Sequence, residues 1–69
     1  MSDRICTVEA LRITRSDTDQ AIYISNPMKP LQCVFLPRAA ITHMSKIEGQ
    51  PGWWSIDLPE NLATEKGII

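Results

Sequence analysis

The side chains that perform most protein chemistry are few in this chain of 69 residues, which has one histidine, two cysteines and eight carboxylates. A catalytic nucleophile needs an adjacent base and a third group that orients the base. His43 stands between Thr42 and Met44, with Ser45 next along the chain, and these neighbours do not complete such a set. We therefore interpret His43 as a partly exposed hairpin residue. We expect a protein that is not an enzyme and has no catalytic residue.

The carboxylates have ordinary structural interpretations. Asp17 and Asp19 stand in a polar turn, where such side chains commonly accept hydrogen bonds from nearby backbone N–H groups. Asp57 and Glu60 flank an expected helix start, where the helix dipole favours negative charge. The three glycines of the chain form no phosphate-binding loop. The sequence therefore predicts no cofactor site.

The two cysteines, Cys6 and Cys33, are far apart in the sequence. In a reducing cytosol they stay thiols, and the simplest interpretation is two small, buried apolar side chains. A disulfide or a redox role is the alternative. Two isolated cysteines and one histidine lack the paired spacing of a zinc site, so we expect no metal.

Aromatic and basic side chains point to binding rather than catalysis. Small β-barrels bind single-stranded nucleic acid with exposed aromatic rings and basic side chains. Trp53 and Trp54 should face opposite sides of a strand, so one of them is a candidate for base stacking, with Tyr23 as a second ring. The candidate phosphate contacts are Arg12, Arg15, Arg38 and Lys46. A formal net charge of −1 gives no general attraction to nucleic acid, and both tryptophans have the alternative role of core or dimer contacts.

Binding to another protein is the interpretation that we prefer. Trp, Tyr, Met and Arg are the residue types enriched at protein interfaces. We predict a host protein or protein complex as partner, with single-stranded nucleic acid as the alternative and no membrane. The candidate partner-binding residues are Trp53, Arg38, Tyr23, Met28, Met44 and Lys46.

The C-terminal third of the chain has the clearest secondary-structure pattern. Trp54, Ile56 and Leu58 alternate with polar residues, which predicts a half-buried strand. A helix from 59 to 66 should follow, because proline suits the first helical position and glycine the residue after the end. We expect Leu62 and these three strand residues to form the core, and Ile68 to fold back onto the helix. Trp54→Ala should then cost ~3–5 kcal/mol.

The N-terminal half predicts three further strands. Residues 5–14 are rich in β-branched side chains, and their imperfect alternation predicts a bulge near Glu9 or Ala10, with a helix as the alternative. Residues 21–25 should form a meander with this first strand. Residues 26–30 contain two prolines and should be the most irregular loop. Residues 31–36 are almost continuously apolar and predict a central strand.

Residues 37–48 allow two structures. Pro37 at the start, Gly49 at the end, and Ala40, Met44 and Ile47 between them would suit a long helix. The alternative is a strand over 42–48, joined to the next by a Gly/Pro loop at 49–52. We favour this hairpin, because the strand that contains Trp54 needs a partner.

Together these patterns predict one small domain over residues 1–69, mainly β in an α+β arrangement. Four or five antiparallel strands should form a small sheet or a partly open barrel with a short C-terminal helix. A chain this short buries only ~60% of its extended surface, and unpaired edges should favour a homodimer. No apolar run approaches the ~18 residues of a membrane span, and the first residues lack a signal peptide's apolar core. We expect a cytoplasmic location.

Three segments carry a resemblance to a known group of proteins. They are Ala21-Ile22-Tyr23-Ile24, then Leu36-Pro37-Arg38 with Ile41, and then Trp54-x-Ile56-x-Leu58-Pro59-x-x-Leu62-Ala63 ending in Lys66-Gly67-Ile68. The pattern resembles that of small uncharacterised proteins encoded by phages and prophages, and it covers about two thirds of the chain. Phe35 and Ala39 depart from it, because the group tends to have Trp and Ser there. The resemblance implies a mobile-element accessory protein acting in the host cytoplasm. Proteins of this size and origin include inhibitors of host defence, such as anti-CRISPR proteins, which act by occlusion.

Overall fold

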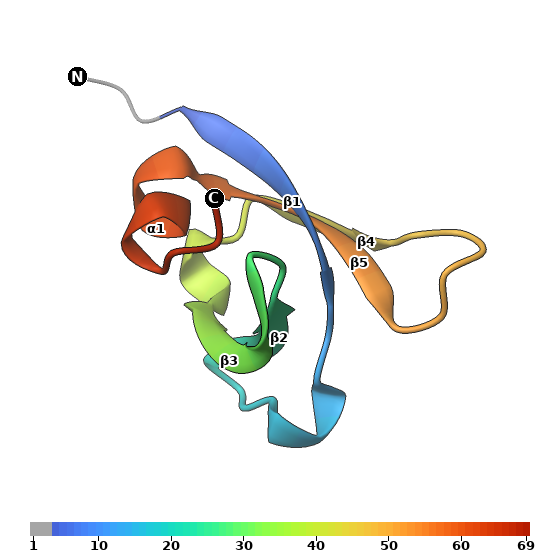
Figure 1. Ribbon diagram of the computed structural model, residues 1–69. Coiled ribbons are helices and arrows are strands. Elements are labelled where there is room, and N and C mark those ends of the chain that lie inside the picture. Colours follow the sequence, from blue (N-terminus) through green and yellow to red (C-terminus); the bar gives the residue numbers. More distant parts are fainter. Residues whose placement is uncertain (1–3) are drawn as a thin grey trace.

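The computed structural model describes residues 4–69, so residues 1–3 of the predicted domain lie outside it. Five strands, two short 3-10 helices and one α-helix follow one another along the chain (Figure 1). The elements are β1 (Ile5–Leu11), η1 (Thr14–Ser16), β2 (Ala21–Asn26), β3 (Lys29–Pro37), η2 (Arg38–Ala40), β4 (His43–Lys46), β5 (Trp53–Pro59) and α1 (Glu60–Glu65). The predicted fold class, mainly β with a short C-terminal helix, is confirmed.

The strands form two antiparallel sheets rather than a closed barrel. One sheet has the order β1-β5-β4, and the other consists of β2 and β3. A single antiparallel bridge between Arg12 and Ile24 connects the end of β1 to β2. Figure 1 shows how β1 crosses from β5 toward the β2–β3 hairpin. The two sheets therefore curve around one interior and leave strand edges unpaired on both sides.

The core lies between the two sheets and the helix. Among residues 4–69 it contains nine buried apolar residues, and Ile22, Ile24, Leu36, Ile56 and Leu58 are among those that are fully buried. Ile56 and Leu58 were predicted core residues and are confirmed. Trp54 and Leu62 are only half-buried and pack against the outside of this cluster. Trp54 and Leu62 were predicted to be core residues, but they are only partly buried. For Trp54 the reason is that β5 extends past the interior at its Trp53 end.

The helix and its end follow the predicted local chemistry. Pro59 is the N-cap rather than the first helical residue, since its ψ of 135° is still extended. Gly67 has a φ of 72°, the left-handed conformation that other residues rarely adopt. The N–H of Gly67 then donates to Thr64 O, and the N–H of Ile68 donates to Ala63 O. This is the Schellman end of a helix, and it places Ile68, only 2% exposed, in the core.

The predicted hairpin, a strand over 42–48 joined by a loop at 49–52 to the next strand, is confirmed, because β4 pairs with β5 and no long helix forms over residues 37–48. Three other predictions are wrong. β1 pairs with β5 in unbroken register, so it has no bulge near Glu9 or Ala10 and no meander with β2 beyond one bridge. β3 has β2 as its one neighbour and is mostly exposed, so it is not a central strand.

The segment 26–30 is irregular as predicted, because the pairing of β2 with β3 shifts register between Ser25 and Asn26, but it also contains strand residues. Strand β2 continues to Asn26, and β3 begins at Lys29, so Pro27 and Met28 alone form the turn. The buried Asn26 side chain accepts hydrogen bonds from the N–H groups of Met28 (2.8 Å) and Lys29 (3.3 Å). The Asn26 Oδ1 thus serves as the acceptor for two turn N–H groups, which is the usual way in which an asparagine side chain stabilises a turn. Among residues 4–69, no helix is long and apolar enough to cross a bilayer.

Candidate functional site

The polar face of the three-stranded sheet contains His43 and Asp57, the residues with the most obvious catalytic potential. They are cross-strand partners, and Thr7 lies beyond Asp57 in the same row. The Thr7 hydroxyl donates to Asp57 Oδ1 at 2.7 Å, so this carboxylate already has a structural partner. His43 is exposed on β4. No group of three metal-ligating side chains gathers within residues 4–69.

The two tryptophans occupy different environments, as their alternation predicts. Trp53 is 37% exposed and pairs with Leu11 across the sheet. Trp54 is half-buried beneath two cations, with the Arg12 guanidinium 4.8 Å and the Lys46 ammonium 5.8 Å from its ring centre. Trp53 is therefore the indole available to a partner.

Arg12 is not available as a phosphate contact, although its position suggested one. Its Nε and Nη2 both donate to Asp17 Oδ2, at 3.1 and 2.7 Å. The other carboxylate oxygen of Asp17 accepts the N–H of Tyr23 at 3.2 Å. Arg12, Asp17 and Trp54 thus form a structural cluster that joins the two sheets. No local pattern indicated this cluster, because a turn aspartate usually caps its own turn.

The other candidate residues are distributed over the molecule. Met28 is 65% exposed at the tip of the β2–β3 hairpin, and Arg38 lies at the opposite end of that hairpin, where its Nε donates to Thr18 O. Tyr23 is half-buried with its ring centroid 6.3 Å from that of Phe35. Met44 is half-buried against the core. The structure thus brings Trp53 near Lys46 and near the hairpin tip, but it does not gather the six residues in one patch.

A groove that the sequence analysis missed runs along the outer edge of β1. One hollow of about 400 Å³ is lined by Thr7, Val8, Glu9, Pro27, Ile68 and Ile69. A second, of about 330 Å³, is lined by Leu11, Ser25, Asn26, Pro27, Pro30 and Trp53. Pro27 borders both, so the hollows adjoin at the hairpin tip. We call them together the β1-edge groove.

Backbone groups of β1 face this groove. The Arg12 N–H donates to Gly52 O on the β5 side, whereas the Ile13 N–H donates to Tyr23 O on the opposite side. Because N–H and C=O groups alternate along a strand, Thr7 and Glu9 direct theirs away from β5. β1 is the outermost strand of its sheet, and these groups have no backbone partner among residues 4–69.

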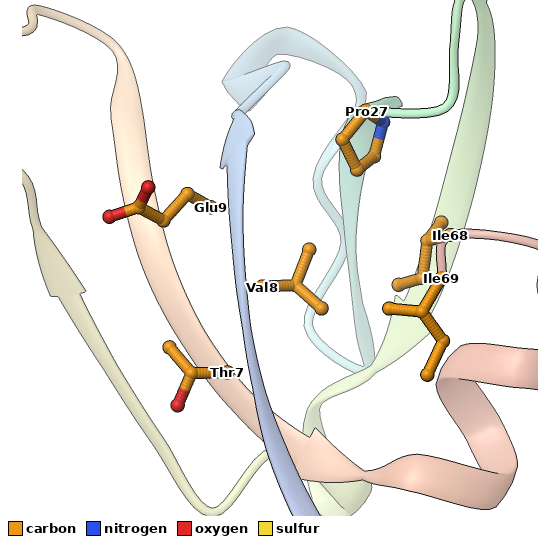
Figure 2. A pocket seen from close by; sticks show the side chains of 6 residues that line it. All are labelled: Thr7, Val8, Glu9, Pro27, Ile68 and Ile69. Atoms are coloured by element: carbon orange, nitrogen blue, oxygen red, sulfur yellow. The ribbon is translucent and has the colours of Figure 1, made fainter.

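The walls of the groove are mostly apolar. Figure 2 shows the Val8 side chain pointing from β1 toward Ile68 and Pro27, with the Thr7 and Glu9 side chains on the other side of the strand. Val8, which is 4% exposed, forms the buried base of the groove. Ile69, which is 51% exposed, forms a wall that is open to solvent. Trp53 and Pro30 extend this apolar lining at the far end.

The polar residues that border the far end are already engaged. Ser25 Oγ donates to Pro30 O at 2.8 Å, and the Asn26 amide donates to Gly67 O at 3.2 Å. The groove therefore offers a guest free backbone groups and apolar contacts. A guest with many polar side chains would find few partners there.

Nonlocal pairing explains why the sequence did not reveal the groove. The alternation of Cys6, Val8 and Ala10 indicated the buried face of β1, but it carried no information about which edge stays unpaired.

Three comparisons, with models of protein families, with curated proteins and with solved structures, find no match to this chain.

Proposed function

We propose that this chain is a non-enzymatic binding protein that takes an extended segment of a host protein into the β1-edge groove as an added strand. The observation that carries the proposal is the row of free N–H and C=O groups at Thr7 and Glu9, bordered by apolar walls. In this mode of recognition, main-chain hydrogen bonds supply affinity and side-chain pockets supply specificity.

Trp53 supplies the specificity in this proposal. Its indole borders the second hollow with Leu11 and two prolines, so it forms an aromatic end wall for an apolar side chain of the guest. Aromatic residues at such positions carry a large share of interface energy. The role that follows from the phage-like pattern is occlusion of a host complex, with a defence system as the proposed target.

Single-stranded nucleic acid is the second candidate, and one observation favours it. Another hollow, of about 460 Å³, also borders Trp53 and is lined by both indoles and Lys46 among others. Stacking of bases on Trp53 would use the same exposed ring. The Arg12 cation beside this site is already neutralised by Asp17, which leaves Lys46 as the available charge there. This favours the protein partner.

A capture experiment with three variants tests the proposal. Glu9→Pro removes one outward N–H without removing a donor to β5, and Glu9→Ala is its matched control because it changes only the side chain. Trp53→Ala removes the end wall. We expect wild type and Glu9→Ala to retain a stoichiometric host protein, and Glu9→Pro and Trp53→Ala to lose it.

The mode of binding is checked by amide exchange on the captured complex. Added-strand pairing should slow exchange at Thr7 and Glu9 and leave the exposed edge of β3 unchanged. Recovery of nucleic acid alone, released by salt and accompanied by tryptophan quenching, would replace the proposal with the second candidate, since counterion release makes such binding salt-dependent. A protein retained equally by all three variants would contradict the groove as the site.

A further inference from the structure

The outer face of the three-stranded sheet, which points away from the core, carries negative charge beside the β1-edge groove. Val8 points from β1 toward the core, so Thr7 and Glu9 lie on the outer face (Figure 2). Asp57 is the cross-strand partner of Thr7 and shares that face. Among the residues of β1, β5 and β4 that alternation places there, two are carboxylates and none is lysine or arginine.

No cation neutralises these two carboxylates in the part of the chain that the structure describes. Glu9 is exposed and forms no ion pair within residues 4–69. Asp57 accepts a hydrogen bond from the neutral Thr7 hydroxyl, so it keeps its charge. His43 faces Asp57 from β4, on the side away from the groove. A strand that pairs with β1 therefore meets uncompensated negative charge on one of its two faces.

The other face of such a strand meets apolar side chains. The first hollow of the groove surrounds Val8 with Pro27, Ile68 and Ile69. Glu9, the one charged residue that borders this hollow, directs its side chain to the other side of β1 (Figure 2). A guest side chain opposite Val8 therefore enters a space without a charged partner, where burying a charge would be costly.

The cysteines contribute to neither face of the groove. Both are free thiols, and Cys6 is half-buried on β1 whereas Cys33 is exposed on β3. The predicted burial is therefore wrong for Cys33. Neither thiol lines the hollow around Val8, so a guest there is held by backbone pairing, charge and apolar contact.

We propose that the guest segment alternates basic and apolar side chains, with a lysine or arginine on each side of a central apolar residue. This inference rests on the proposed function and adds the chemistry of the guest. Residues opposite one another in paired strands point to the same face, in either strand direction. The guest residue opposite Val8 thus enters the hollow, and its two neighbours, opposite Thr7 and Glu9, lie on the outer face with the carboxylates.

Long basic side chains suit these two outer positions. Opposite charges on neighbouring strands stabilise a sheet, and like charges destabilise it, so an acidic guest residue opposite Glu9 is disfavoured. Lysine and arginine have apolar stems that extend over neighbouring side chains, which lets a cation opposite Thr7 reach over it toward Asp57. Backbone pairing thus holds the guest, and charge selects it.

Selection from a random peptide library tests this chemistry without knowledge of the host protein. Linear heptapeptides displayed on phage are panned on wild type and on Glu9→Pro, which lacks one outward N–H. We expect the peptides enriched on wild type to alternate basic and apolar residues and to be lost from Glu9→Pro. Another pattern that is also lost from Glu9→Pro would overturn the guest chemistry and leave the proposed function standing. Peptides that both proteins retain equally, or no enrichment at all, would overturn both.

Charge variants test the carboxylate with defined probes. One fluorescent peptide alternates lysine and valine, and the other alternates glutamate and valine. By fluorescence anisotropy, wild type should bind the lysine probe about tenfold more tightly than the glutamate probe. Glu9→Gln should weaken lysine-probe binding about two- to fivefold, the effect of one exposed ion pair, and Glu9→Lys should reverse the preference. The loss is small enough that Glu9→Ala still captures the host protein.

The matched control is Glu48→Gln, which removes the same charge from an exposed position in the loop between β4 and β5. It should bind both probes as wild type does. Ile69→Ser removes an exposed apolar wall of the hollow and should weaken both probes alike. Equal binding of the two probes by wild type, or equal effects of Glu9→Gln and Glu48→Gln, overturns the basic guest.

Discussion

The two sheets of this protein differ in strand pairing and in how deeply their strands are buried. In the three-stranded sheet, β5 is paired on both sides, and its inward side chains Ile56 and Leu58 are fully inaccessible to solvent. In the β2–β3 hairpin, Leu36 is the one residue of β3 that is buried. Ile22 and Ile24 of β2 are fully buried as well, so both sheets contribute to the core, and the part of the molecule with little apolar burial is the outer strand β3.

Polar side chains hold the hairpin to the rest of the molecule. Asp17 connects it to the end of β1 through Arg12 and Tyr23, and Asn26 connects its tip to the C-terminal Gly67. Hydrogen bonds to buried polar groups contribute modestly but are costly to break on one side only. The comparison teaches that the three-stranded sheet and β2 set the stability of the domain through apolar burial, and that a few polar contacts help to set the position of the hairpin.

The largest effect is expected from the central strand. Leu58→Ala creates a cavity in the core and should destabilise the domain by about 2–5 kcal/mol. A chain of this length has a total stability on the order of 3–10 kcal/mol, so the variant should be largely unfolded. Urea denaturation followed by tryptophan fluorescence measures the change.

Leu31→Ala is the matched control for this prediction, because it is the same substitution at a fully exposed site of β3. It should change the stability of the monomer by less than about 0.5 kcal/mol. Equal losses for the two leucines would show that the exposed strand β3 contributes as much to stability as the buried strand β5, and would contradict the comparison. The measurement is made at concentrations low enough to keep the chain monomeric.

Local patterns in the sequence predicted the β4–β5 hairpin and the helix well, although they did not predict that β1 pairs with β5. Alternation placed Ile56 and Leu58 inside, and Gly67 after a helical segment predicted the helix end and the burial of Ile68. The Gly/Pro loop predicted the β4–β5 hairpin. Each of these features depends on residues that are close together in the chain.

The β2–β3 hairpin was predicted less well, because the environment of its side chains depends on residues that are distant in the sequence. The apolar run from Leu31 to Leu36 indicated a central strand, but strand order is decided by which partners remain, and β5 pairs with β1 and β4 instead. Asn26 begins an irregular segment, as predicted, but the sequence did not show that its side chain organises the turn. The β1-edge groove has the same origin, since β1 lacks a second neighbour over most of its length.

The second-largest effect should come from the hairpin tip. Asn26 is 2% exposed and makes three hydrogen bonds, two to turn N–H groups and one to Gly67 O. Asn26→Ala leaves those groups without partners and should cost about 2–3 kcal/mol. Amide exchange at Met28 and Lys29 should accelerate more than exchange in β5. Met28→Ala, at the neighbouring exposed position, is the control and should leave both measurements unchanged.

A smaller effect is expected where Asp17 joins the sheets. Asp17→Asn keeps an acceptor for the Tyr23 N–H but removes the ion pair with Arg12, whose two side chains are 12% and 14% exposed. Charge-assisted hydrogen bonds are stronger than neutral ones, so this substitution should lower the free energy of unfolding by about 1 kcal/mol. Asp19→Asn removes the same charge at an exposed position and should be neutral. If Asp17→Asn and Asp19→Asn lower the free energy of unfolding equally, the change in net charge, and not the loss of the Arg12 contact, causes the destabilisation.

The smallest effect tests a direct link between the helix and the hairpin. The Lys66 ammonium lies 3.7 Å from the ring centre of Phe35, and this contact joins the end of α1 to β3. An exposed cation–π pair contributes about 0.5–1 kcal/mol. A double-mutant cycle with Lys66→Met and Phe35→Leu isolates this energy, because each substitution keeps most of the apolar side chain. Measured in the monomer, a coupling energy in that range would show that α1 stabilises both sheets. A coupling energy near zero would mean that the helix supports the three-stranded sheet alone, and that the polar contacts of Asp17 and Asn26 account for the position of the hairpin.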